Sequence, residues 1–174
     1  MTTDPFRLTG RTWVFGDHVN TDLMYPGASF SATPEERRAL VFSMNRPGWS
    51  ALVREGDVLV AGINFGTGSG RPGAQLLREL GIGGVVAESI NGLFFRSCVN
   101  YALPAMECPG VGALVTEGDV VDVDFLAGTV VNTASGARLE NGSRIPSGLT
   151  EVIRVGGLLP HLEAAGYVEA ELPT

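Results

Sequence analysis

No lysine occurs among the 174 residues of the chain, so all twelve Lys or Arg positions are arginines. A nucleotide-binding loop of the Walker type requires a lysine, and its absence excludes that class of protein. Nineteen acidic residues outnumber the arginines and give a net charge of −7. Because nucleic acids are bound by basic surfaces, this acidic balance indicates that nucleic acid is not a partner.

Long apolar runs are also absent. No run approaches the roughly 20 residues that a membrane-spanning helix needs, and residues 1–5 have neither the basic nor the apolar region of a signal peptide. A cytoplasmic protein without a membrane partner is therefore expected. The length, together with a hydrophobic content of 44%, predicts one globular domain that covers residues 1–174.

Cysteine is scarce, since Cys98 and Cys108 are the only two, and each stands in an apolar stretch. Zinc and iron–sulfur sites require three or four ligands. No metal site and no bound cofactor are therefore predicted for this chain alone. Free cysteine is among the residue types most often buried, and both thiols are predicted to lie in the core.

The most informative segment is a glycine-rich loop at residues 64–74, which joins an apolar strand pattern at 58–61 to a helical pattern at 75–80. Three of its glycines can take positive φ and bring backbone N–H groups close to a ligand, namely Gly66, Gly68 and Gly70. Ser69 and Arg71 are the reactive side chains of the loop. They precede a helix whose N-terminal end favours a carboxylate or a phosphate.

Two other interpretations of this loop remain open from its residues alone. Residues 68–73 fit the Gly-x-Gly-x-x-Gly pattern of dinucleotide-binding loops, but the next strand leads to Glu88 and Ser89, a weak match to the acid that binds ribose. A glycine-rich turn without any chemistry is the second alternative.

The hydrophobic pattern predicts an α/β core. Strands at residues 57–62 and 84–87 flank a helix at 72–80, an alternation that favours parallel pairing. Further strands are predicted at 11–15 and 104–108.

Two more helices are predicted from capping and spacing. Thr33 and Glu36 form a capping box, which predicts a helix that runs to residue 43 or 44. Residues 91–102 carry apolar side chains at helical spacing, which predicts a core-facing helix. These side chains are Leu93, Phe94, Cys98 and Val99.

Beyond Gly118 the pattern changes to period two, which predicts an antiparallel meander. The alternation places Asp122 and Asp124 on its solvent face rather than in a catalytic site. Residues 149–165 predict one or two helices broken near residues 156–160.

Four segments, in order, resemble the small subunit of the isopropylmalate isomerase branch of the aconitase superfamily. They are residues 16–22 with Pro26 and Gly27, residues 60–69, residues 87–100 and residues 103–109. The resemblance implies a swivelling β/β/α domain like the carboxy-terminal domain of aconitase, with a mixed sheet and flanking helices. It implies the small subunit of a hydro-lyase of leucine biosynthesis, which is active only with a large subunit as a heterodimer or heterotetramer.

The same resemblance implies roles for individual residues. Ser69 would be the proton-abstracting base, Arg71 would grip a carboxylate of a small carboxylic acid substrate, and Asp22 would orient neighbouring charged groups. Further substrate-binding positions are Thr67, Gly68 and Gly70 in the loop and Ser29, Phe30 and Ser31 in a second loop. The large subunit would carry a 4Fe–4S cluster.

Two departures from the family pattern bear on the substrate. Gly70 stands where the family has a second serine, and Gly92 stands where it has an arginine. Because both changes remove donors for carboxylates, isopropylmalate is expected to be a poor substrate and smaller diacids better ones. The alternatives are a hydratase of a short unsaturated diacid such as maleate or citraconate, and a non-catalytic module that binds carboxylates.

Overall fold

The computed structural model describes residues 4–68 and 71–169. Its strands are β1 (Arg7–Val14), β2 (Asp57–Ala61), β3 (Ile82–Ala87), β4 (Ala105–Glu107), β5 (Val120–Asp124), β6 (Thr129–Asn132) and β7 (Arg138–Leu139). They form one sheet in the order β4-β3-β2-β1-β5-β6-β7. The first four strands of that order pair in parallel and the remaining pairs are antiparallel. The mixed sheet confirms the predicted fold class.

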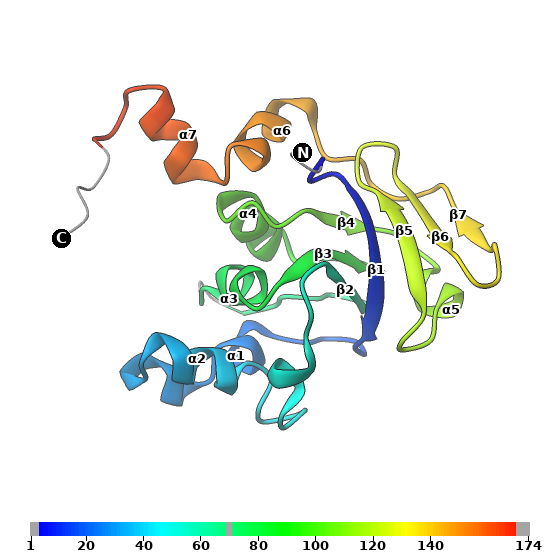
Figure 1. Ribbon diagram of the computed structural model, residues 1–174, viewed down its shortest axis with the longest axis horizontal. Helices are drawn as coiled ribbons and strands as arrows, with labels where there is room; N and C mark the ends of the chain where they lie inside the picture. Colours follow the sequence, from blue (N-terminus) through cyan, green and yellow to red (C-terminus); the bar gives the residue numbers. More distant parts are fainter. Residues whose placement is uncertain (1–3, 69–70, 170–174) are drawn as a thin grey trace.

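Helices pack around the parallel strands. In chain order the helices are α1 (Thr21–Met24), α2 (Pro34–Leu40), α3 (Gly73–Glu79), α4 (Gly92–Asn100), α5 (Val111–Leu114), α6 (Ser147–Arg154) and α7 (Leu158–Ala164). Two short 3-10 helices span Gly27–Ser31 and Trp49–Leu52. Figure 1 shows α1 to α4 on one side of β1 to β4, and α5 on the other side together with β5 to β7. The parallel strands are thus enclosed from both sides.

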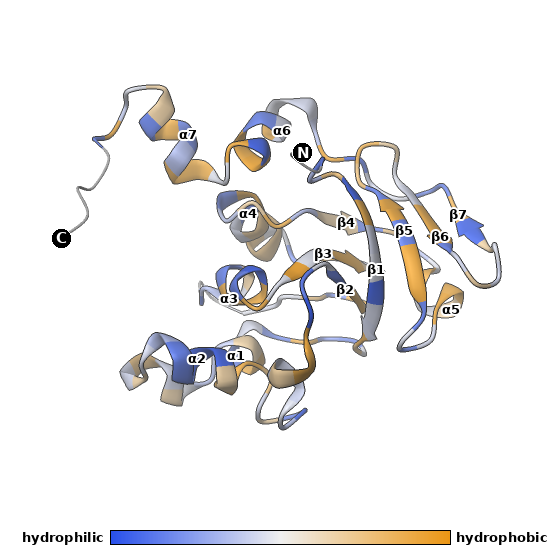
Figure 2. Ribbon diagram, in the orientation of Figure 1, coloured by the Kyte–Doolittle hydropathy of each residue, from blue (hydrophilic) through white to orange (hydrophobic). Residues whose placement is uncertain are grey.

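Alternating side chains of the parallel strands enter two separate hydrophobic clusters. Leu59 and Ala61 of β2 pack in the cluster beneath α1 to α4. Val58 and Val60 pack in the opposite cluster, with the inward side chains of β5 and β6. The apolar residues of these strands appear orange in Figure 2. Burial on both faces explains why β2 is an unbroken apolar run.

A buried carboxylate fixes the edge of the first cluster. Asp57 accepts hydrogen bonds from Nη2 of Arg11 at 2.6 Å, Nε1 of Trp13 at 2.7 Å and the backbone N–H of Arg54 at 2.9 Å. Burial alone would raise the pKa of Asp57, but these hydrogen bonds outweigh it and hold the pKa below its ordinary value. The ionised carboxylate is therefore a structural element of the fold.

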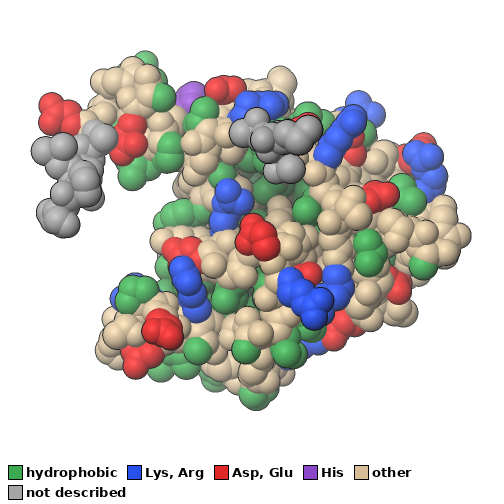
Figure 3. Space-filling view, viewed as in Figure 1, with side chains coloured by type: hydrophobic (Ala, Val, Ile, Leu, Met, Phe, Trp, Pro, Cys, Tyr) green, Lys and Arg blue, Asp and Glu red, His purple; other side chains and the backbone are tan. Residues whose placement is uncertain are grey.

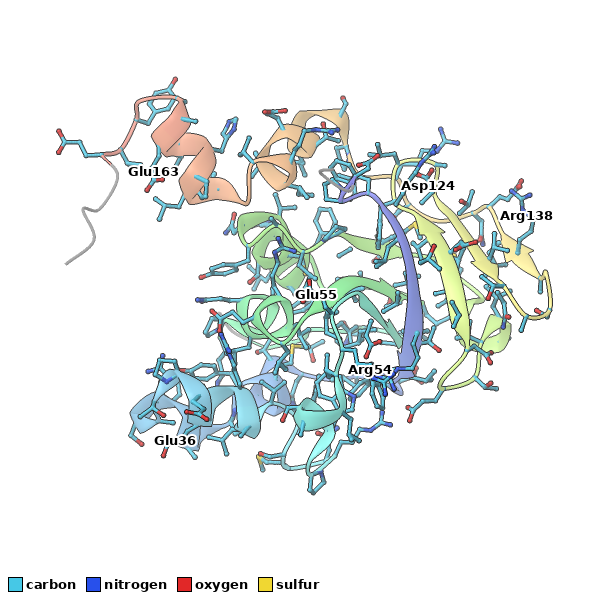
Figure 4. All side chains as sticks on the ribbon, in the orientation of Figure 1. Glu36, Arg54, Glu55, Asp124, Arg138 and Glu163 are labelled. Atoms are coloured by element: carbon cyan, nitrogen blue, oxygen red, sulfur yellow. The ribbon has the colours of Figure 1, made fainter. Side chains whose placement is uncertain are left out.

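The predicted capping box is present at the start of α2. Oγ1 of Thr33 accepts from the N–H of Glu36, and Oε2 of Glu36, labelled in Figure 4, accepts from the N–H of Thr33. The helix ends at Leu40, earlier than predicted. Phe42 takes a φ of +57°, which ends helical geometry at that point.

The predicted antiparallel meander is confirmed by β5, β6 and β7. Val121 and Val123 are buried, whereas Asp122 faces solvent. Asp124, labelled in Figure 4, is partly buried and accepts a hydrogen bond from Nε of Arg7 at 3.0 Å. The two acids therefore lie on the polar side of the meander, as the alternation predicts.

The C-terminal helices separate at Gly156 and Gly157, as predicted. Pro160 does not break the chain again, because it lies in the first turn of α7, where its missing N–H costs no helical hydrogen bond. Arginines and acidic side chains are interspersed over the face in Figure 3. Among the described residues, no helix has the length and apolar character to cross a membrane.

Candidate active site

The segments that follow three neighbouring parallel strands converge at one end of the sheet. Isolated parallel bridges extend the pairing beyond the strands, joining Asn20 to Thr67 and Phe65 to Ile90. The N–H of Thr21 donates to the carbonyl oxygen of Thr67 at 2.7 Å. The carboxyl ends of parallel strands are where α/β proteins commonly bind ligands, and here they bring the glycine-rich loop against the start of α1.

Two predicted glycines of the loop have positive φ, Gly66 at +77° and Gly68 at +109°. A Cβ at Gly66 would overlap the ring of Phe94, and a Cβ at Gly68 would lie 2.7 Å from Oγ1 of Thr21. Backbone conformation and space therefore both require glycine at these positions. The other two predicted loop residues, Ser69 and Gly70, lie outside the described residues.

Arg71 is held by three neighbours. Its Nε lies 2.8 Å from Oδ1 of Asp22, and its Nη1 donates to the carbonyl oxygen of Tyr25 at 2.6 Å. The guanidinium carbon lies 5.4 Å from the centre of the Phe30 ring. The Arg71 side chain is 26% exposed and that of Asp22 is 59% exposed. The structure thus brings together three predicted site residues that are distant in sequence.

The three predicted residues of the second loop, Ser29, Phe30 and Ser31, differ in their position relative to Arg71. Phe30 is 65% exposed and packs edge-on against Tyr25, with ring centres 5.2 Å apart. Ser29 is fully buried, and its carbonyl oxygen accepts from the Tyr25 hydroxyl and from Nε of Arg37. Ser31 is exposed. Of the three candidates in this loop, Phe30 is the one that the structure places beside Arg71.

A cleft of about 360 Å³ opens beside the loop. The described residues that line it are Thr21, Gly66, Gly68, Arg71, Pro72, Leu93, Phe94, Arg96, Ser97, Asn100 and Tyr101. Thr21 is 3% exposed, and its Oγ1 has no hydrogen-bond partner among the described residues. Thr67 is not among the lining residues, and its carbonyl oxygen anchors α1 instead. The hydroxyl of Thr21 is therefore a buried polar group in the wall of the cleft.

The residues of α4 that line the cleft were not predicted as site residues from the sequence. Leu93 was predicted to face the core but is 56% exposed and lines the cleft. Phe94, Cys98 and Val99 are buried as predicted. The omitted signal is the spacing of the exposed residues themselves, which recur at the third and fourth positions along the helix. They are Leu93, Arg96, Asn100 and the C-cap residue Tyr101, with the partly buried Ser97 between them.

The two cysteines take no part in this site. Both are buried in the hydrophobic core. Burial raises the pKa of Cys98, and burial followed by the charge of Glu88 raises that of Cys108. A protonated thiol is a poor nucleophile and a poor metal ligand. Within the described part of the chain, no three His, Cys, Asp or Glu side chains gather in a way that could hold a metal ion.

Comparison with known proteins gives consistent matches over nearly the whole chain. The isopropylmalate/citramalate isomerase small subunit of Methanocaldococcus jannaschii is 38% identical over 158 residues, which cover 90% of this chain and 94% of that protein. The 3-isopropylmalate dehydratase small subunit 1 of Methanopyrus kandleri is 37% identical over 161 residues, covering 91% and 94%. The 3-isopropylmalate dehydratase small subunit of Halothermothrix orenii is 33% identical, covering 90% and 96%.

A solved structure agrees with these matches. The crystal structure of 3-isopropylmalate dehydratase from Methanocaldococcus jannaschii superposes with a TM-score of 0.84 and 29% sequence identity, covering 92% of this chain and 96% of that one. A search of protein-family models gave no match.

Proposed function

The chain belongs to the family of 3-isopropylmalate dehydratase small subunits, hydro-lyase subunits of leucine biosynthesis, and we propose that with a separate large subunit it interconverts a hydroxylated dicarboxylic acid and its dehydrated or isomeric form. The observation that carries this proposal is the Asp22–Arg71 ion pair at the cleft. It joins the N-terminal segment to the glycine-rich loop, two of the segments on which the family resemblance rests.

The substrate class follows from the names of the relatives and from the charge of the cleft. Isopropylmalate and citramalate, named for the relative from Methanocaldococcus jannaschii, are both malic acids that carry an alkyl group. Such a substrate has two carboxylates. Arg71 uses Nε and Nη1 for its described partners, which leaves Nη2 without a partner among the described residues. A guanidinium with free donors is suited to bind one carboxylate.

We assign the proton-abstracting role to Ser69, which directly follows Gly68 in the sequence. Because a neutral serine hydroxyl is a weak base, Ser69 would act as an alkoxide after its own proton has passed to solvent, and backbone N–H groups and a nearby cation would stabilise that alkoxide. We expect these N–H groups and this cation to come from Gly68 and Arg71, which line the cleft and flank residues 69 and 70 in the sequence. The C–H proton α to a carboxylate would pass to the alkoxide and regenerate the serine hydroxyl, the C–H electron pair would form the double bond, and the substrate hydroxyl would leave from the adjacent carbon.

The iron–sulfur cluster of the proposed enzyme is assigned to the large subunit. The thiols of Cys98 and Cys108 are buried in the core, so these two residues do not fit a cluster on this chain. A 4Fe–4S cluster with an open iron would supply a Lewis acid for the substrate hydroxyl. The residues of this chain would bind the carboxylates and accept the proton.

The test is reconstitution with the large subunit of the same organism under anaerobic conditions. We expect the isolated chain to be colourless and inactive, and the mixture to convert a 2-hydroxy diacid to its unsaturated acid, followed by the rise in ultraviolet absorbance of the double bond. Stoichiometric iron in the isolated chain would overturn the division of roles.

The two alternative functions give different results in the same assay. A hydratase of maleate or citraconate would form the hydroxy acid from the unsaturated acid but would not yield a positional isomer. A non-catalytic module would bind diacids in calorimetry without turnover in any combination. Either result would replace the proposed function.

A further inference from the structure

The exposed face of α4 forms one wall of the cleft, and its only charged residue there is Arg96. The residues of this wall follow one another at three- and four-residue intervals, so they lie on a single stripe of the helix. The opposite wall comes from the glycine-rich loop and carries Arg71. The cleft therefore has one guanidinium on each wall.

The two arginines differ in how they are held. Arg71 has a carboxylate, a carbonyl oxygen and an aromatic ring as neighbours. Arg96 is exposed and has no hydrogen bond or ion pair with any residue that the structure describes. Its donors are thus available to a ligand, whereas those of Arg71 are in part already committed.

The charge of the lining differs from that of the whole protein. The described lining includes two arginines and no acidic residue, although the chain carries a net charge of −7. Arg71 is paired with Asp22 beside the cleft, so Arg96 is the lining cation without a described ion-pair partner, and such a cation attracts ligands of the opposite sign. The unpartnered Oγ1 of Thr21, 3% exposed, adds a buried hydrogen-bonding group to the same cleft. The unpaired guanidinium of Arg96 is therefore the charge that the described lining offers to an anion.

The place of Arg96 on the helix explains a feature of the sequence. Gly92 stands where the resembled family has an arginine, which predicts the loss of a cation. Arg96 lies four residues later, one turn along the same face of α4. The cleft thus retains a cation on this wall, one turn further along the helix.

We propose that Arg96 binds the second carboxylate of the substrate, so that the small subunit holds a dicarboxylate between Arg71 on one wall and Arg96 on the other. This inference rests on the proposed function and assigns the recognition of the second carboxylate to a residue of α4. A planar guanidinium binds a carboxylate through two parallel hydrogen bonds. A ligand with one carboxylate leaves Arg96 without a partner once the large subunit closes the cleft, and an unpaired charge in such a site weakens binding.

The experiment compares two competitive inhibitors of the reconstituted enzyme, a saturated diacid such as methylsuccinate and its monoamide. For Arg96→Gln we expect the inhibition constant of the diacid to rise at least tenfold, while that of the monoamide stays within twofold. Arg96→Lys should fall between the two, because it keeps the charge and loses the paired hydrogen bonds. Affinity for the large subunit, measured in parallel, separates substrate recognition from assembly.

The matched control is Arg78→Gln, which removes the same charge from an exposed position on α3 outside the cleft. It should behave as the wild type. An Arg96→Gln enzyme that keeps its preference for the diacid, or that loses affinity for both inhibitors equally, would overturn the inference. Absence of turnover by the wild-type complex would instead overturn the proposed function, so the two failures are distinguishable.

Discussion

Oδ1 of Asp22 lies 2.8 Å from Nε of Arg71, joining α1 to the loop after β2. Asp22 is predicted to orient neighbouring charged groups; Arg71 lies beside it, and the orienting role stays a prediction. Because the Asp22 side chain is 59% exposed, the ion pair contributes little to stability. Its effect is on geometry, since it fixes the direction in which the remaining guanidinium donors point.

Asp22→Asn should therefore weaken substrate binding more than turnover. We expect KM to rise about three- to tenfold, kcat to change less, and the free energy of unfolding to stay within about 0.5 kcal/mol. Asp22→Glu should restore part of the loss. Asp122→Asn, which removes the same charge from the solvent face of β5, is the control and should leave both constants unchanged. A fall in kcat at constant KM would argue against a positioning role.

Ser69→Ala should remove turnover and leave folding and partner binding intact. A positioned proton-transfer group contributes about 10²–10⁴ in rate, and no second serine follows it, because position 70 is glycine. Arg71→Lys should instead mainly raise KM, since lysine keeps the charge but lacks the planar fork. Ser147→Ala, at an exposed position on α6, is the control. If Ser69→Ala retains more than about a tenth of the wild-type kcat, Ser69 is not the base.

Gly66→Ala should destabilise the fold around the site. Its Cβ would overlap the Phe94 ring, and its φ is +77°. Overpacking costs about 1–3 kcal/mol, and left-handed geometry adds about 1–2 kcal/mol for a residue with a side chain. The matched control is Gly92→Ala, at the start of α4, where nothing lies within 4 Å of the added atom. Urea unfolding that shows equal stabilities for the two variants would contradict the close packing of the loop on α4.

Much of the fold was predictable because its signals are local. The apolar run of β2, the Thr33 capping box and the alternation of β5 each specify an element within a few residues. The ends of strands and helices are harder to predict where a residue is unfavourable for the element that contains it. The predicted strand starts at residue 11, after Gly10, a residue type that strands disfavour. In the structure, β1 includes Gly10 and begins at Arg7.

The site was predictable only in part, because its geometry depends on contacts between distant segments. The glycine-rich loop has a clear pattern, and Gly66 and Gly68 have the predicted positive φ. The ion pair of Asp22 with Arg71 has no sequence pattern of its own. The helical spacing of Leu93 with Phe94, Cys98 and Val99 predicts one core-facing stripe, but the core needs only one face of α4, and the packing of neighbouring elements decides which.

Stability should decline as the solution is acidified, beginning near pH 4. The pKa of Asp57 and that of Glu36 lie below their ordinary values, the latter mainly through the backbone N–H of Thr33. A carboxyl with a lowered folded-state pKa takes up its proton more readily in the unfolded chain. Its stabilising effect is therefore complete above its ordinary pKa of about 4 and is lost as the pH falls through the lower folded-state value.

Urea-unfolding midpoints between pH 7 and pH 2.5 measure this dependence. Asp57→Asn should be less stable than the wild type at pH 7, because it loses the ionised partner of Arg11, and its midpoint should fall less steeply on acidification. Asp122→Asn, at an exposed position, should keep the wild-type slope. Parallel slopes for Asp57→Asn and the wild type would show that other carboxyl groups govern the acid response.

Substrate size provides the last prediction, because position 70 is glycine where the resembled family has a serine. A carboxylate oxygen that loses this hydroxyl donor in a closed site costs about 1–3 kcal/mol. A small diacid such as citramalate can shift toward the guanidinium of Arg71, whereas the branched alkyl group of isopropylmalate restricts that movement. We therefore expect the reconstituted enzyme to have a higher kcat/KM for citramalate than for isopropylmalate.

A panel of hydroxy diacids with four to seven carbons, assayed on the wild type and on Gly70→Ser, tests this reasoning. Gly70→Ser should raise kcat/KM for isopropylmalate more than for citramalate, because it restores the donor that the larger substrate cannot replace by moving. A control substitution, Gly16→Ser, lies where nothing is within 4 Å of an added Cβ, and should leave the ratio unchanged. Preference of the wild type for isopropylmalate over every smaller diacid would show that the hydroxyl at position 70 does not set substrate size.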